Sequence, residues 1–222
     1  MDGPAGVGKS TVARMLARRL NLRYVDTGAM YRCVALQARR QGISPEDAAA
    51  LSECARSAQI ELRTDPQDPR ILLDGEDVTR SIREDEIGSL ASVGSQIGGV
   101  REAMVALQRQ IGSSGGVVME GRDIGSVVFP NAKMKVFLTA SPGERARRRA
   151  GELAVESSSR SPDATQIQTD IEIRDRRDQT RKISPLMPAP DAAMIDTDGL
   201  SAEEVVNRIM ELIANIELSD HQ

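Results

Sequence analysis

The stretch from Gly3 to Thr11 constrains the fold more than any other part of this chain. It reads Gly, four residues, Gly, Lys and then Ser. In this pattern the glycines let successive backbone N–H groups point into one concavity, which suits a chain of phosphates. Val12, Leu16 and Leu20 predict a helix directly after the loop. The predicted phosphate-binding residues are Gly3, Pro4, Ala5, Gly6, Val7, Gly8, Lys9, Ser10 and Thr11.

Two side chains of this loop have predicted roles. Lys9 would bring its charge to the β and γ phosphates, and the Ser10 hydroxyl would be a ligand for Mg²⁺. A loop of this type normally follows a buried β-strand, but only Met1 and Asp2 precede Gly3. Two residues rise about 7 Å as a strand, which is too little to cross a sheet. We therefore expect the natural protein to carry an apolar segment of about five residues upstream, a typical strand length.

Composition excludes several classes of function. The 222 residues carry 29 basic and 33 acidic side chains, a balance that argues against general binding of nucleic acid or anionic membranes. Trp is absent and Phe and Tyr number two each, so stacking platforms for single-stranded nucleic acid are not expected. The chain contains no membrane-length apolar run and no signal-peptide pattern. Cys33 and Cys54 lack metal-ligand spacing and are interpreted as packing residues. We expect a cytoplasmic monomer.

The apolar patterns predict a single α/β domain. Strands are expected at 23–25, 117–119, 135–139 and 193–196, separated by helices at 29–41, 44–57, 81–110, 142–149 and 163–181, with a last helix capped by Ser201. Ser44 is the expected cap of the second of these helices, and Gly98-Gly99 is expected to break the long one. Two alternating runs, 59–63 and 70–74, predict a small antiparallel insertion. The expected fold is a mostly parallel sheet flanked by helices, with ligands at the carboxyl ends of the strands.

The arginines indicate what the triphosphate site acts on. Arg32 follows the turn Asp26-Thr27-Gly28, and Arg122 lies where a buried strand ends. Arg174, Arg177 and Arg181 share one helix face, which could also be a solvated surface with internal salt bridges. Arginines around a triphosphate suit phosphoryl transfer to an acceptor that is itself anionic and needs no general base. The single histidine, His221, lies in the tail, and the polar stretch 157–162 is the expected mobile lid that excludes water.

Several segments carry a resemblance that covers nearly the whole chain. They are Asp2 to Thr11, Asp26 to Arg32, Gly75 to Thr79, Ala91 to Val93, Val100 to Ala103, Gly121 to Pro130, Glu144 to Ala146, and Arg174 to Asp178 with Arg181 and Pro185-Leu186. In this order they resemble the bacterial cytidylate kinases of the nucleoside monophosphate kinase family. The resemblance implies a P-loop kinase core (1–26, 112–149 and 182–222), a monophosphate-binding region (27–111, with a small sheet at about 59–80) and a lid at about 150–168. It also implies transfer of the ATP γ-phosphate to CMP or dCMP with Mg²⁺, giving CDP or dCDP and ADP.

The resemblance assigns roles by position. Lys9, Arg122 and Arg181 are the implied catalytic residues, and Arg148 would lie near ATP. The acceptor phosphate would be bound by Thr27, Arg32, Arg122 and Arg181, the cytosine by Ser92, Arg101 and Asp123, and the sugar by Arg174 and Asp178. An Asp that accepts from the exocyclic amine of cytosine would discriminate against uracil, which presents an oxygen there.

Three alternatives stay open. One is a related P-loop kinase that acts on UMP, AMP or a non-nucleotide acid. Another is a nucleotide-binding switch, although the chain has no guanine-reading Asn-Lys-x-Asp segment and the acceptor-site arginines would then have no purpose. The third is an N-terminally truncated, inactive fragment. The predicted lid, 150–168, has little that matches the family, so no role is assigned to Arg160.

Overall fold

The computed structural model describes residues 1–156 and 164–219. Its main strands are β1 (Arg23–Asp26), β5 (Val117–Glu120), β6 (Val136–Thr139) and β7 (Ala193–Asp196). β1 pairs with β5 and β6 pairs with β7, both in parallel. All four strands agree with the expected positions. β5 and β6 have the short, continuous apolar runs that are typical of buried parallel strands.

Met1 and Asp2 join these two pairs into one sheet. The Gly121 N–H donates to the Met1 carbonyl at 3.0 Å, and the Asp2 N–H donates to the Val136 carbonyl at 2.8 Å. Asp2 also forms a parallel bridge with Phe137. The resulting order is β1, β5, Met1-Asp2, β6, β7, so the segment just before the phosphate loop lies in the middle of the sheet. The apolar segment expected upstream stays a prediction.

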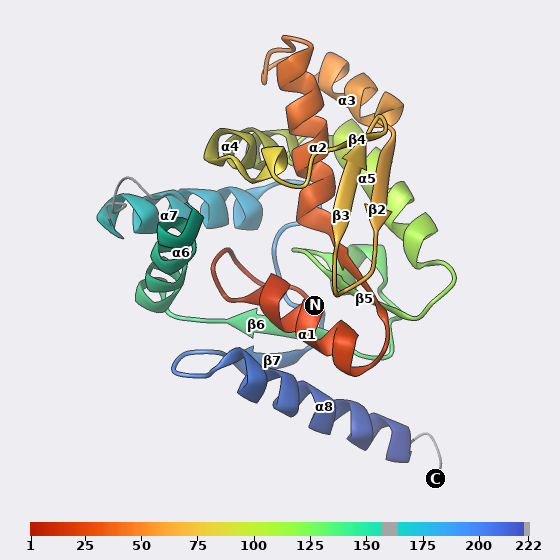
Figure 1. Cartoon of the computed structure of the whole chain (residues 1–222), viewed down its shortest axis with the longest axis vertical. Coiled ribbons are helices and arrows are strands. Elements are labelled where there is room, and N and C mark those ends of the chain that lie inside the picture. The colour runs from red at the N-terminus through yellow and green to blue at the C-terminus, as the bar shows by residue number, and fades with distance from the viewer. Residues whose placement is uncertain (157–163, 220–222) are drawn as a thin grey trace.

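Two helices cover the part of the sheet that carries the loop. These are α1 (Lys9–Arg19) and α8 (Ala202–Ser219), and α8 runs below β6 and β7 (Figure 1). Their apolar faces meet the sheet in a core that includes Val12, Leu138 and Ile209. The Ser201 hydroxyl accepts from the Glu204 N–H at 3.3 Å while the Glu204 carboxylate accepts from the Ser201 N–H at 2.8 Å, so the predicted cap is confirmed.

The upper half of Figure 1 is the region between β1 and β5 in sequence. It contains α2 (Thr27–Arg40), α3 (Ala48–Ser57), the 3₁₀ turn η1 (Ser81–Arg83), α4 (Asp85–Gly94) and α5 (Gly98–Gly112). The predicted antiparallel sheet is confirmed as β2 (Ile60–Arg63), β3 (Arg70–Leu73) and β4 (Glu76–Asp77), in that order.

Two details differ from the sequence predictions. The cap of α3 is Asp47, whose carboxylate accepts from the Ala50 N–H at 2.9 Å, so the prediction of Ser44 was wrong; the Ser44 hydroxyl instead bonds Glu46. The long helix does break, but at residues 95–97, and Gly98 and Gly99 open α5. A Cβ on Gly99 would lie 2.6 Å from Cβ of Ser52, so glycine is needed there because α3 and α5 pack closely.

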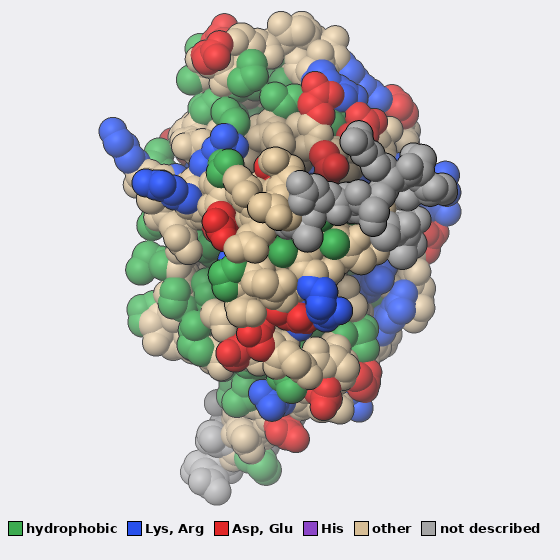
Figure 2. Space-filling model, turned by 90° about the vertical axis from the view of Figure 1, so that its left-hand side faces the viewer, with side chains coloured by type: hydrophobic (Ala, Val, Ile, Leu, Met, Phe, Trp, Pro, Cys, Tyr) green, Lys and Arg blue, Asp and Glu red, His purple; other side chains and the backbone are tan. Residues whose placement is uncertain are grey.

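The last two helices lie beside the loop. These are α6 (Pro142–Glu156) and α7 (Ala164–Thr180), which pack together through Ala146, Ile167 and Ile171. Both ends of the predicted lid are therefore helical, and the loop predicted at 157–162 lies outside the described residues. On this face basic and acidic side chains are interspersed (Figure 2). No helix in the described part of the chain is long and apolar enough to cross a membrane.

Candidate active site

The phosphate loop has the backbone that its glycines predict. Gly3, Gly6 and Gly8 adopt φ angles of 148°, 78° and 88°, a region that disfavours side chains. A Cβ on Gly3 would lie 2.4 Å from the carbonyl oxygen of Leu138, so the loop can lie directly against β6 only without a side chain at this position. Gly8 precedes the first residue of α1, and the positive end of that helix therefore faces the loop.

Lys9 lies inside the loop, with a relative exposure of 6%. Its ammonium donates to the Pro4 carbonyl at 2.6 Å. Burial lowers the pKa of Lys9 and repulsion from Arg122 lowers it further, while Glu120 acts in the opposite direction. Lys9 is thus a buried cation inside the loop, and an added anion would stabilise its charge.

A buried carboxylate lies beside Ser10. Glu120, at the end of β5, is 3% exposed and accepts from the Tyr24 hydroxyl at 2.8 Å. Burial raises the pKa of Glu120, as does repulsion from Asp26, whereas a hydrogen bond with the Ser10 side chain lowers it. A hydroxyl beside two carboxylates that repel each other fits Mg²⁺, which binds one or two protein oxygens and takes its other ligands from phosphates and water.

Four cations from four elements gather in front of the loop: Lys9, Arg32, Arg122 and Arg174. Burial lowers the pKa of Arg174 to about 9, and repulsion from Arg122 and Arg32 adds to this. Burial and the neighbouring Arg83 and Arg122 lower the pKa of Arg32 as well. The Nε of Arg174 is buried without a hydrogen-bond partner among residues 1–156 and 164–219. A bound polyanion would relieve the repulsion among these buried cations, so the cluster is a candidate polyanion site.

A second cluster lies around Asp123, directly after Arg122. Asp123 pairs with Arg101, and its other oxygen lies 3.5 Å from Nη2 of Arg181. The Arg101 guanidinium carbon lies 5.8 Å from the centre of the Tyr31 ring. Ser92 is connected to the cluster through Ser95, whose hydroxyl donates to the Ser92 carbonyl at 2.9 Å and whose carbonyl accepts from Arg101 at 3.5 Å. The three predicted base-reading residues therefore belong to one buried polar cluster.

Asp178 connects this cluster to the cations. Its Oδ2 accepts from Nε of Arg122 at 2.9 Å, and its Oδ1 lies 4.0 Å from Nη1 of Arg181. Burial opposes the charge of Arg122, but Asp178, together with Asp175 and Glu120, raises the pKa of Arg122 above the ordinary value. The solvated-surface alternative for this face of α7 is wrong, because Asp178 and Arg181 are buried and Arg174 is half-buried.

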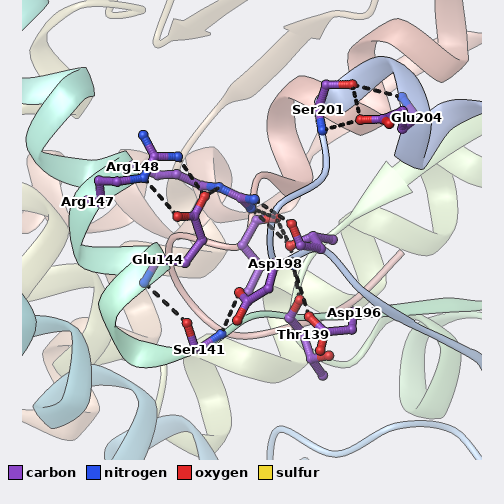
Figure 3. Close-up of polar contacts among 11 residues, drawn as sticks. Thr139, Ser141, Glu144, Arg147, Arg148, Asp196, Asp198, Ser201 and Glu204 are labelled. Carbon is purple, nitrogen blue, oxygen red and sulfur yellow. Dashed lines mark hydrogen bonds and ion pairs between the residues drawn. The ribbon is translucent and has the colours of Figure 1, made fainter.

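Arg148 lies beside the phosphate loop, and its proximity to ATP stays a prediction. It donates through Nη1 to the Val7 carbonyl at 3.2 Å and through Nη2 to the Thr197 carbonyl at 2.6 Å, and its Nε bonds Glu144 at 2.7 Å. Figure 3 shows Glu144, Arg147 and Arg148 of α6 next to Thr139 and Asp196, which end β6 and β7. Arg148 therefore connects the loop to α6 and to the segment after β7.

Comparison with known proteins decides the family. Residues 1–215 match the family model described as cytidylate kinase. The chain belongs to the cytidylate kinase family. It is 49% identical over 215 residues to cytidylate kinase from Pelotomaculum thermopropionicum, covering 96% of this chain and 94% of that protein. It is 51% identical over 210 residues to cytidylate kinase from Desulforamulus reducens, covering 95% and 93%.

A third relative shows the same domain in a larger protein. The chain is 49% identical over 215 residues to the bifunctional pantoate ligase/cytidylate kinase of a Synechococcus species, covering 96% of this chain but 39% of that protein. A member of the cytidylate kinase family is an ATP-dependent kinase of nucleoside monophosphates. The predicted P-loop kinase fold and enzyme class are therefore confirmed.

Some residues of this candidate site were missed by sequence reasoning. No role was given to Glu120 or Asp26, which are the last residues of β5 and β1. Asp2 was noted only for its position before the loop; its buried carboxylate accepts from the N–H groups of Ile124 and Gly125, each at 2.8 Å. The signal for Asp2 was a charged residue directly before the loop, where a buried strand should end, because a buried carboxylate needs polar partners.

Proposed function

We propose that this member of the cytidylate kinase family transfers the γ-phosphate of ATP to CMP or dCMP, giving CDP or dCDP and ADP. The observation that carries the proposal is the continuity of two buried clusters. Lys9 and three arginines form a polyanion site, and Arg122, Asp178 and Arg181 connect it to the Arg101–Asp123 pair. A nucleoside monophosphate has this arrangement of charge, with a phosphate at one end and a polar base at the other.

The donor phosphates are assigned to the loop, with Lys9 on their β and γ oxygens. Arg122, which is bonded to Asp178, would neutralise the negative charge that develops between the donor and acceptor phosphates. Arg181, near the other oxygen of Asp178, would add a second positive charge. The acceptor is a phosphate oxygen that is already nucleophilic, so positioning and charge neutralisation suffice. Thr27 supports the floor of the site, because its hydroxyl donates to the Glu120 carbonyl at 2.7 Å.

Asp123 is proposed to select cytosine. Its carboxylate would accept a hydrogen bond from the exocyclic amine, whereas uracil presents an oxygen that the carboxylate would repel. Burial raises the pKa of Asp123, and Arg101 and Arg181 oppose that rise, so both arginines favour the charged carboxylate. Ser92 completes the proposed base site.

Ser10 and Glu120 are proposed to hold Mg²⁺. The ion would neutralise the phosphate oxygens during transfer. Arg174 was assigned to the sugar together with Asp178, but repulsion from Arg122 and Arg32 indicates that Arg174 also faces phosphate. The division into core, monophosphate-binding region and lid, the monomeric state and the cytoplasmic location are part of the same proposal.

A panel of acceptors tests this function. CMP, dCMP, UMP, AMP and a small phosphorylatable acid are each supplied with ATP and Mg²⁺, and ADP release is followed by a coupled assay. We expect CMP or dCMP to be preferred, and Lys9→Met to lose several orders of magnitude in turnover while it melts at the same temperature. Preference for another acceptor would reject the assignment, and a chain without a cooperative melt that CMP raises would favour the inactive fragment.

A further inference from the structure

Two consecutive residues of α7 serve two different sites. Arg174 faces the cations of the proposed acceptor site, as described above. Asp175, the next residue, is 5% exposed, and its Oδ1 accepts from the Ala5 N–H of the phosphate loop at 3.0 Å. The proposed reaction gives Asp175 no role.

Arg145 of α6 completes this contact. Its guanidinium pairs with Oδ2 of Asp175 and also donates to the Ala5 carbonyl at 3.2 Å. Both backbone polar groups of Ala5 are therefore bonded by side chains, one from each of the last two helices beside the loop. The Ala5 N–H, which was predicted among the phosphate-binding groups, donates to Asp175 in this structure.

The backbone of the loop also lies tightly against α6. A Cβ on Gly6 would lie 3.0 Å from both Cβ and the carbonyl oxygen of Arg145. Because the Arg145–Asp175 pair is buried, loss of either partner would leave an uncompensated charge. The position of the loop around Ala5 and Gly6 therefore depends on the positions of α6 and α7.

The other end of this connection is the acceptor site. Asp178 lies one turn after Asp175 on α7 and bonds Arg122 at 2.9 Å, and Arg181 follows directly after the helix. A shift of α7 that accompanies acceptor binding would move Asp175 with it, because the residues lie within one turn of a rigid helix. Asp175 also acts electrostatically on Lys9 and Arg122.

We propose that Asp175, held by Arg145, is a positioning residue that couples the phosphate loop to the acceptor site. Binding of a nucleoside monophosphate then sets the loop in the geometry that binds the triphosphate. Because coupling is reciprocal, the triphosphate raises the affinity for the monophosphate by the same factor. The inference rests on the proposed function for the identity of the two ligands.

Binding measurements test the coupling without turnover. The dissociation constant of CMP is measured by calorimetry with and without a non-hydrolysable ATP analogue and Mg²⁺. For the unchanged protein we expect the analogue to tighten CMP by about 5- to 150-fold, the usual range of such coupling. In Asp175→Asn the oxygen that accepts from Ala5 remains but the charge opposite Arg145 is lost. The analogue should then change the dissociation constant of CMP by less than about twofold. CMP alone should bind within about twofold of normal.

The matched control is Asp170→Asn, on the same helix. Asp170 is exposed and bonds Gln166 at 2.8 Å, so this variant should keep the full coupling. Arg145→Lys retains the charge and one hydrogen bond and should keep part of the coupling, which provides a second variant if Asp175→Asn does not fold. Normal coupling in a folded Asp175→Asn or Arg145→Met protein would overturn the inference. Absence of coupling in the unchanged protein would overturn it too, whereas failure of CMP to bind at all would also reject the proposed function.

Discussion

Replacement of Asp123 by Asn separates base selection from stability. The side chain keeps its size but loses its charge, and an amide NH₂ replaces one oxygen that now faces Arg101 or Arg181. Both arginine side chains are only 2% exposed, so they cannot recover the lost partner from water. Two consequences follow, one for folding and one for recognition of the acceptor.

The structure sets the size of each effect. Breaking a buried ion pair costs about 3–5 kcal/mol, a large part of a typical stability of about 5–15 kcal/mol. A hydrogen bond to a charged group contributes about 1.5–3 kcal/mol, so loss of the proposed contact with the cytosine amine lowers kcat/KM for CMP about 10- to 150-fold. The Asn amide can donate to the uracil oxygen, so kcat/KM for UMP should fall less or rise.

The assay is the ratio of kcat/KM for CMP and UMP, measured with ATP and Mg²⁺ below the melting temperature of Asp123→Asn. Any unfolded fraction cancels in this ratio, because both substrates meet the same active protein. Glu102→Gln, an exposed change on the helix that carries Arg101, is the control and should leave the ratio unchanged. A CMP to UMP ratio that stays within about twofold of normal in Asp123→Asn would refute the reasoning.

Two further predictions concern the loop. The pH profile of kcat/KM for ATP should be bell-shaped. As the pH falls, Glu120, whose pKa burial and Asp26 raise, takes up a proton and loses the charge proposed to hold Mg²⁺; as the pH rises, Lys9, whose pKa burial and Arg122 lower, loses its proton. A flat profile between about pH 5 and 10 would contradict both assignments. Gly3→Ala should destabilise the protein by at least about 1–3 kcal/mol, lowering Tm by roughly 2–12 °C in a thermal melt, because its Cβ meets backbone of β6. Gly88→Ala, in open space within α4, should keep or raise Tm because alanine favours a helix, and equal Tm values for the two variants would be evidence against the clash.

Local patterns predicted most of the fold. The strands predicted at 117–119 and 193–196 are found at 117–120 and 193–196. The Ser201 cap was predicted because Ser201 comes just before the last amphipathic run, and the structure adds its partner Glu204. The predicted Ser44 cap was wrong for a local reason as well. Asp47 lies within the same turn and is a comparable cap, and sequence alone does not decide which of two adjacent caps begins the helix.

The site was predicted in its chemistry but not in its connections. Arg101 and Asp123 were assigned to one base, yet their direct pairing depends on how α5 packs against the end of β5. Asp175 was missed entirely, because an acidic residue among arginines on a charged helix is typical of a solvated surface. Its burial follows from the packing of α6 against α7, which brings Arg145 to it across 30 positions of sequence.

The sequence by itself determined the phosphate loop, the order of helices and strands, and the family. These follow from interactions between residues close in sequence and from residue patterns that other members of the family also carry. Only the tertiary structure decided which charges are buried, which of them face one another, and that Met1 and Asp2 lie in the middle of the sheet. The physical reason is that the energy of a charge depends on its distance from distant groups and from water, and both are set only when the helices and strands pack.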